Sequence, residues 1–147
     1  MGKLKRFEDM EVWISARGLA KRIHAISQNP QFFRDYGLRD QIRRASVSIV
    51  SNIAEGFESQ SNPIFCRYLA SARGSAAEVR TQLYIALDWG YISRSDCSAL
   101  ISQTESISRQ LTGFINYLHN SQRKHESRIT NHESRITNLE SRISNHN

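Results

Sequence analysis

Apolar residues recur with a helical period in the first half of the chain. Between residues 9 and 28 the spacing alternates between four and three, which predicts one amphipathic helix; its inner face comprises Val12, Ala16, Leu19, Ile23 and Ile26. Pro30 should interrupt this pattern, because proline disfavours helix at the residue before it. A second helical face follows Gly37 and comprises Leu38, Ile42, Ala45, Ile49 and Ile53. Gly56 is predicted to end this second helix as a C-terminal cap.

Two further helical patterns follow. Asn62 and Pro63 have the residue types of a helix start, and Gly90 is predicted to end the third helix. Its inner face comprises Phe65, Leu69, Ala72, Ala76, Val79, Leu83 and Ala86. Ser93 or Ser95 can cap a fourth helix. Its inner face comprises Leu100, Thr104, Ile107, Leu111, Ile115 and Leu118.

No segment alternates between apolar and polar residues as a half-buried strand does. Four amphipathic helices with mostly short connections predict an all-α fold, most simply an antiparallel up-down-up-down four-helix bundle. We assign this domain to residues 1–124.

Residues 125–147 form a separate heptad-repeat tail, "HESRITN HESRITN LESRISN". The spacing of its seam positions alternates between four and three, as in a coiled coil; they are His125, Ile129, His132, Ile136, Leu139 and Ile143. Ser, Thr and Asn are mediocre helix formers, and three heptads are few. Of the two alternatives, a coiled coil or a frayed or disordered tail, the sequence favours the second.

The second helix carries a further apolar stripe. At 100° per residue Val47, Val50 and Ala54 fall opposite the first stripe, and Asn52 and Glu55 lie on a flank between the two. A four-helix bundle covers only one side of each helix. These five residues are therefore predicted to form a homo-oligomer interface, with a solvated flank as the alternative for Asn52 and Glu55.

The formal net charge of +6 belongs entirely to the predicted bundle. Residues 125–147 contain three Arg and three Glu, which leaves 17 basic against 11 acidic residues in the first 124. Such an excess indicates an anionic partner such as RNA or DNA, although many basic proteins bind none. The candidate phosphate-binding residues are basic pairs one or two helical turns apart: Arg17 and Lys21, Arg39 and Arg43, and Arg73 and Arg80.

The sequence offers little for catalysis. It contains no HExxH motif, no glycine-rich phosphate loop and no metal-ligand spacing of Cys66 and Cys97, so we expect neither an enzyme nor a metal or other cofactor. No apolar run approaches the length of a membrane span, and the N-terminus does not resemble a signal peptide. We expect a cytoplasmic protein without a membrane partner.

The words "QIRRA" at residues 41–45 and "SNIAEG" at residues 51–56, with Gly74, Ser75 and Glu78 further on, resemble a known family. About residues 7–118 are similar to the bacterial four-helix bundle proteins of the ribosomal-RNA intervening-sequence family. A related branch is the accessory variability determinant of diversity-generating retroelements. The resemblance implies a homopentamer of non-enzymatic bundles and, for the retroelement branch, binding of nucleic acid and reverse transcriptase through a basic surface.

Two features depart from the family pattern. Val50 stands where many relatives have proline, and the nearly neutral "ESQSNPIF" at residues 58–65 replaces a basic loop. The second departure weakens the transfer of nucleic-acid binding through that loop. The sequence therefore predicts a homo-oligomeric bundle that binds RNA or another nucleic acid, and the alternative is a protein-interaction scaffold that docks a protein such as a reverse transcriptase.

Overall fold

The computed structural model describes residues 4–145, which form helices and, within that range, no strand. The predicted all-α class is therefore confirmed. A 3-10 helix, η1, spans Phe7–Asp9. The α-helices are α1 (Glu11–Ile26), α2 (Pro30–Arg34), α3 (Tyr36–Glu58), α4 (Asn62–Asp88) and α5 (Arg94–Ser144).

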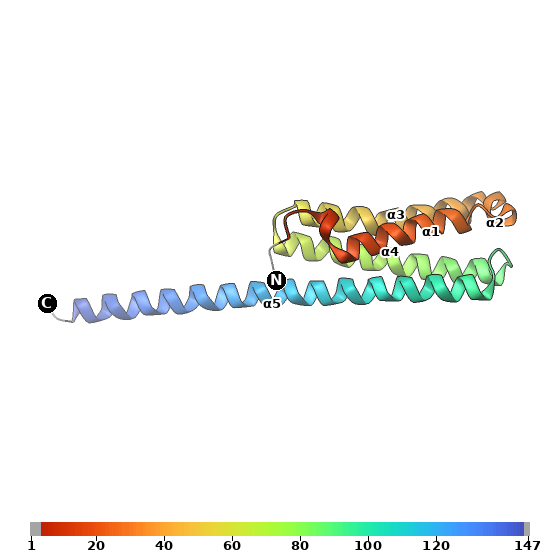
Figure 1. Cartoon of the computed structure of the whole chain (residues 1–147). Coiled ribbons are helices and arrows are strands. Elements are labelled where there is room, and N and C mark those ends of the chain that lie inside the picture. Colours follow the sequence, from red (N-terminus) through yellow and green to blue (C-terminus); the bar gives the residue numbers. More distant parts are fainter. Residues whose placement is uncertain (1–3, 146–147) are drawn as a thin grey trace.

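The long helices lie side by side in the order of the chain. α4 packs against both α3 and α5, and α1 packs against α3 and α5, so each of these helices has two neighbours (Figure 1). We call this packed part, residues 7–118, the helical body. The C-terminal half of α5 projects beyond it as a single helix.

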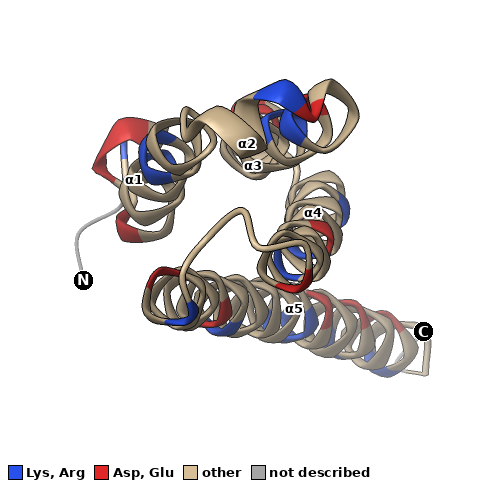
Figure 2. Ribbon diagram, turned by 90° about the vertical axis from the view of Figure 1, so that its right-hand side faces the viewer, with Lys and Arg blue, Asp and Glu red and all other residues tan. Residues whose placement is uncertain are grey.

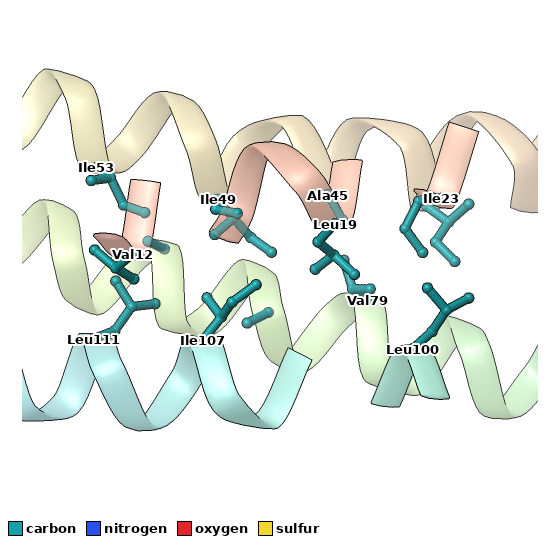
Figure 3. Packing of buried hydrophobic residues seen from close by; sticks show 14 of the residues in the cluster. Val12, Leu19, Ile23, Ala45, Ile49, Ile53, Val79, Leu100, Ile107 and Leu111 are labelled. Atoms are coloured by element: carbon teal, nitrogen blue, oxygen red, sulfur yellow. The ribbon is translucent and has the colours of Figure 1, made fainter. Parts of the chain in front are cut away.

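The predicted inner faces meet in the core of the helical body. Ile23, Ile49, Val79 and Ile107 are fully buried, and the side chains of all four long helices point toward one another in Figure 3. Of the inner-face residues predicted for the four helices, only Ile26 at the end of α1 is half-buried instead of buried. Helical periodicity alone therefore identified most of the core, although not the buried Met10, Phe32 and Ile92.

Polar side chains cap three helix starts. Ser93 accepts a hydrogen bond from the Asp96 amide at 3.0 Å, as predicted, and Asp35 accepts one from the Leu38 amide at 3.1 Å. The cap of α4 is Ser61 and not Asn62, which is the first residue of the helix. Gly90 ends α4 with a φ of +77°, a conformation that side-chain-bearing residues avoid.

One predicted helix boundary was wrong, and one short helix was not predicted. The helical pattern is interrupted before Pro30 as expected, because α1 ends at Ile26 and Asn29 is not helical. Pro30 also occupies the first turn of the short helix α2, where its missing N–H costs nothing, and α2 buries Phe32. Gly56 does not end α3, which continues to Glu58. A Cβ atom at Gly56 would lie 2.7 Å from Cβ of Tyr68 on α4, so the glycine is explained by close helix packing and not by a cap.

The structure also differs from the expectation of a frayed tail. α5 continues without interruption to Ser144, and residues 146–147 of the predicted tail lie outside the described residues. A helix anchored in the body extends without a new nucleation cost, and the chain contains no Gly or Pro between residues 114 and 144. We call residues 125–144 the α5 extension. All of its residues are exposed.

Candidate nucleic-acid interface

Arg39 lies at the corner between α2 and α3, enclosed by its neighbours. Its guanidinium carbon lies 4.4 Å from the ring centroid of Phe33 and 4.8 Å from that of Tyr36. Its Nε donates to the Asp40 carboxylate at 2.9 Å, and its side chain is only 16% exposed. Arg39 is therefore fixed in position, with part of its charge already paired.

Arg43 joins α3 to the C-terminal end of α1. Its Nε donates to Ser27 Oγ at 2.7 Å, and its Nη2 donates to the His24 carbonyl at 3.4 Å and to Gln28 Oε1 at 3.2 Å. The last carbonyls of a helix lack partners within the helix, so a cation here satisfies one of them and complements the helix dipole. Arg43 thus has a structural function in addition to its charge.

Arg17 and Lys21 lie one turn apart on the exposed side of α1. The guanidinium carbon of Arg17 lies 5.6 Å from the ring centroid of Trp13, a distance at which cation–π attraction orients the side chain. Neither residue forms an ion pair with any other described residue. Of the six predicted residues, these two are the most free to reach a phosphate.

Arg73 and Arg80 lie on the side of α4 that faces α5. Nη1 of Arg73 donates to Thr112 Oγ1 at 3.2 Å, and Nε of Arg80 is buried without a hydrogen-bond partner in the described residues. Of the six residues, Arg39 and Arg43 share a neighbour, with guanidinium carbons 4.4 Å and 5.8 Å from the Phe33 ring centroid, whereas Arg17 and Lys21 lie on α1 and Arg73 and Arg80 on α4. Viewed along the helices, Lys and Arg appear on every long helix of the body (Figure 2).

The five predicted interface residues differ in exposure. Val47 is 56% exposed and Glu55 is exposed, whereas Val50, Asn52 and Ala54 are half-buried. Val50 packs against the hydrophobic core, so the second apolar stripe is already partly covered within the chain.

Asn52 is part of a polar connection between α3 and α4. Its Nδ2 donates to the Ser48 carbonyl at 2.8 Å and to Ser48 Oγ at 3.0 Å, and Ser48 Oγ lies 3.0 Å from Ser75 Oγ on α4. The amide therefore has partners within its own chain. Asn52 of the "SNIAEG" word therefore has a structural role within its own chain.

A polar groove between α3 and α4 was not predicted. It has a volume of about 330 Å³ and is lined chiefly by Gln41, Arg44, Ser48, Ser75, Glu78 and Gln82. Gln82 is buried and its Oε1 has no partner in the described residues. Four of these six lining residues, Gln41, Arg44, Ser75 and Glu78, belong to the words that carried the family resemblance, although the sequence alone did not show that they line a groove.

The described residues offer little reactive chemistry. Within residues 4–145 no group of three or more His, Cys, Asp or Glu side chains could hold a metal ion. Burial raises the pKa of the Cys66 thiol, and burial followed by the nearby Asp88 carboxylate raises that of Cys97, so both favour the unreactive thiol form. No described helix is long and apolar enough to cross a membrane.

Comparison with known proteins decides the family. The model of the 23S rRNA-intervening sequence protein family matches residues 8–113. The chain belongs to this family. The chain is also similar to a protein whose crystal structure has been determined. That protein is of unknown function, belongs to the S23 ribosomal protein family and comes from Bacteroides thetaiotaomicron.

That similarity covers most of each chain. The two chains share 26% sequence identity with a TM-score of 0.66, and the match covers 71% of this chain and 97% of the other. No curated protein matches the chain. The match to the 23S rRNA-intervening sequence family model includes all six candidate basic residues and ends before the α5 extension.

Proposed function

We propose that this member of the 23S rRNA-intervening sequence protein family is a non-enzymatic, homo-oligomeric protein that binds RNA or another nucleic acid through its basic surface. Its subunit would be an antiparallel up-down-up-down four-helix bundle. The packing of α1, α3, α4 and α5 against two neighbours each supports this arrangement.

The observation that carries the proposal is the location of the charge. The whole excess of 17 basic over 11 acidic residues lies within residues 1–124, whereas the remaining residues are neutral in sum. A field of one sign over a folded surface attracts the phosphate backbone regardless of base sequence. The absence of a base-reading motif in the sequence fits binding with weak sequence preference.

The six basic residues would contribute in different ways. Arg17 and Lys21 are exposed and unpaired among the described residues, so they would contact phosphates directly. Arg39 and Arg43 are fixed by their neighbours and would contribute a preorganised positive field. A ring of subunits, pentameric by the family resemblance, would multiply these surfaces, and the exposed Val47 supports a subunit contact through α3.

A comparison of paired variants of the full chain tests the RNA-binding part. Arg17→Gln with Lys21→Gln removes two charges from the proposed surface, and Arg94→Gln with Arg109→Gln removes two exposed charges elsewhere. We expect the first pair to lower the affinity for a single-stranded RNA by about tenfold and the second to change it little. If both double variants lost the same RNA affinity, net charge alone would explain the loss, and the assigned phosphate-binding positions would be contradicted.

The second candidate function is a scaffold that docks a protein such as a reverse transcriptase. Exposed large apolar side chains favour it, because Val47, Tyr36 and Trp89 are each more than half exposed. Under this alternative the charge serves solubility alone. The same RNA titration separates the two, since a scaffold would bind RNA no better than an unrelated protein of equal net charge.

A further inference from the structure

We infer that the α5 extension is a homotypic interaction surface, which pairs in parallel and in register with the extension of a second copy of this chain. The inference does not depend on the proposed nucleic-acid binding. It concerns residues 125–144, which lie beyond the family match and are all exposed.

An apolar stripe on the extension is exposed and is not covered by any described part of the chain. Ile129, Ile136, Leu139 and Ile143 are 45%, 43%, 58% and 67% exposed. With heptad positions labelled a to g, every a position is isoleucine, and Leu139 is a d position that follows His125 and His132 at the preceding d positions. Isoleucine at a with leucine at d favours a two-stranded parallel coiled coil.

The flanks of this stripe carry strictly segregated charge. All three e positions are Glu and all three g positions are Arg; they are Glu126, Glu133 and Glu140, and Arg128, Arg135 and Arg142. In Figure 2 the acidic residues follow one edge of the C-terminal part of α5 and the basic residues follow the opposite edge.

The charges identify the partner and its direction. In a parallel pair, a g residue lies near the e residue five positions later in the other chain, so Arg128 would face Glu133 and Arg135 would face Glu140. In an antiparallel pair, g faces g and e faces e, which would oppose like charges throughout. Within one chain a spacing of five does not bring two side chains together on a helix. A second copy in parallel is therefore the occupant that pairs Arg128 with Glu133 and Arg135 with Glu140.

The remaining surface of the extension is suited to solvent. The b, c and f positions are Ser, Thr or Asn in each heptad. Four of the hydroxyls donate to the carbonyl four residues earlier, each at 3.0 Å; they belong to Thr130, Thr137, Ser141 and Ser144. The extension thus has a single apolar face that a partner could cover. This argues for a pair of helices and against burial on all sides.

Pairing constrains the course of α5. The seam continues the heptad phase of Leu111 and Leu118, which face the helical body, and a straight helix drifts only about 20° per heptad from that phase. Two straight parallel helices would therefore place each body in the space of the other. The helices must diverge between residues 119 and 124, where "HNSQRK" is polar throughout.

Cysteine cross-linking of the full chain tests the direction and register. Leu139→Cys introduces a thiol at a seam position, and Ser141→Cys introduces one at an f position two residues away as the matched control. Parallel, in-register pairing brings the two copies of residue 139 within disulfide range, so we expect Leu139→Cys to form covalent dimers at least about tenfold faster under mild oxidation. The native Cys66 and Cys97 are buried, and the unsubstituted chain measures their background.

Charge reversal tests the partner. In the Leu139→Cys background, Glu133→Arg with Glu140→Arg leaves both flanks basic, and Arg128→Glu with Arg135→Glu leaves both flanks acidic. We expect each protein alone to lose most of its cross-linking and an equimolar mixture to recover it. Equal rates for positions 139 and 141, or cross-links formed only between Ile129→Cys and Leu139→Cys chains, would overturn the inference.

Strengthening the seam gives an independent measure. His125→Leu with His132→Leu fills two d positions, and Ser127→Leu with Ser134→Leu adds the same residues at f positions. We expect only the first pair to raise the cross-linking rate of Leu139→Cys. RNA affinity should be the same in the two Leu-substituted proteins, whose formal net charge is unchanged, so a failure here leaves the proposed function standing, and a failure to bind RNA leaves this inference standing.

Discussion

Gly56 of α3 lies directly against Tyr68 of α4, so close that a Cβ atom added to the glycine would stand 2.7 Å from Cβ of the tyrosine. Phe65 on the same helix would lie 3.0 Å away. The last turns of α3 can approach α4 only because residue 56 has no side chain. The "SNIAEG" word thus includes a packing requirement as well as polar residues.

Gly56→Ala should destabilise the chain by about 1–3 kcal/mol, because the methyl group forces two packed helices apart. Gly74→Ala and Gly113→Ala are matched controls in helices with nothing within 4 Å of the added atom, and each should stabilise by about 0.5–1 kcal/mol. Urea unfolding followed by circular dichroism measures all three. A Gly56→Ala protein as stable as the unsubstituted chain would contradict the packing explanation.

Arg43→Gln should cost about 1–3 kcal/mol of stability, because it removes charge-assisted hydrogen bonds to Ser27 and to the end of α1. Arg44→Gln changes the adjacent, exposed arginine and should stay within about 0.5 kcal/mol. The same unfolding measurement compares them. If both variants behaved alike, Arg43 would have no structural function, and its charge alone would account for its place in the candidate interface.

Tyr91 should make stability depend on alkaline pH. Its hydroxyl donates to Asp35 Oδ2 at 2.9 Å, and this hydrogen bond, followed by burial and the charge of Asp35, raises the pKa of Tyr91 above its ordinary value of 10.0. Because the pKa of Tyr91 is higher in the folded state than in the unfolded state, its hydrogen bond contributes fully to stability below about pH 10. This contribution is lost as the pH rises through the folded-state pKa.

Tyr91→Phe should therefore lower the melting temperature at neutral pH by a few degrees and weaken its decline above about pH 10. Tyr117→Phe, at a tyrosine that is 62% exposed and donates no hydrogen bond among the described residues, is the control. Thermal scans between about pH 7 and pH 11 provide the test. If the melting temperature of Tyr91→Phe still fell steeply above about pH 10, groups other than Tyr91 would be responsible for the alkaline loss of stability.

Val47→Glu should weaken the proposed assembly without unfolding the chain, because Val47 is exposed in the single subunit and would be buried only against another. Val50→Glu should do both, since Val50 packs against the core. Light scattering should give a mass above twice 16.9 kDa for the unsubstituted chain and a lower mass for Val47→Glu. Thr81→Glu, exposed on α4, should leave the mass unchanged.

The sequence predicted the helical class and the core because both depend on the spacing of apolar residues. It did not predict α2, since a proline is found both where a helix is interrupted and in the first turn of a helix. It misassigned Gly56 because both a helix cap and a close contact between helices favour glycine. The frayed tail was predicted from helix propensity alone. That argument omits the fact that α5 is already formed in the body and continues into the extension.

The candidate interface was predicted less completely. The basic residues could be selected from charge and helical spacing, but Phe33 beside Arg39 and the partners of Arg43 and Arg73 lie on other helices or at their ends. Spacing along one helix cannot reveal such contacts. For the same reason Gln82, whose surroundings combine α3 and α4, was not singled out.

The salt dependence of RNA affinity tests the central claim most directly. Binding of the full chain to a single-stranded RNA is measured between about 50 and 200 mM salt, with an unrelated protein of equal net charge as the reference. If about four basic groups contact phosphates, the plot of log affinity against log salt should have a slope near −3 and lie well above the reference. An affinity that is indistinguishable from the reference, or that does not change with salt, would contradict the account.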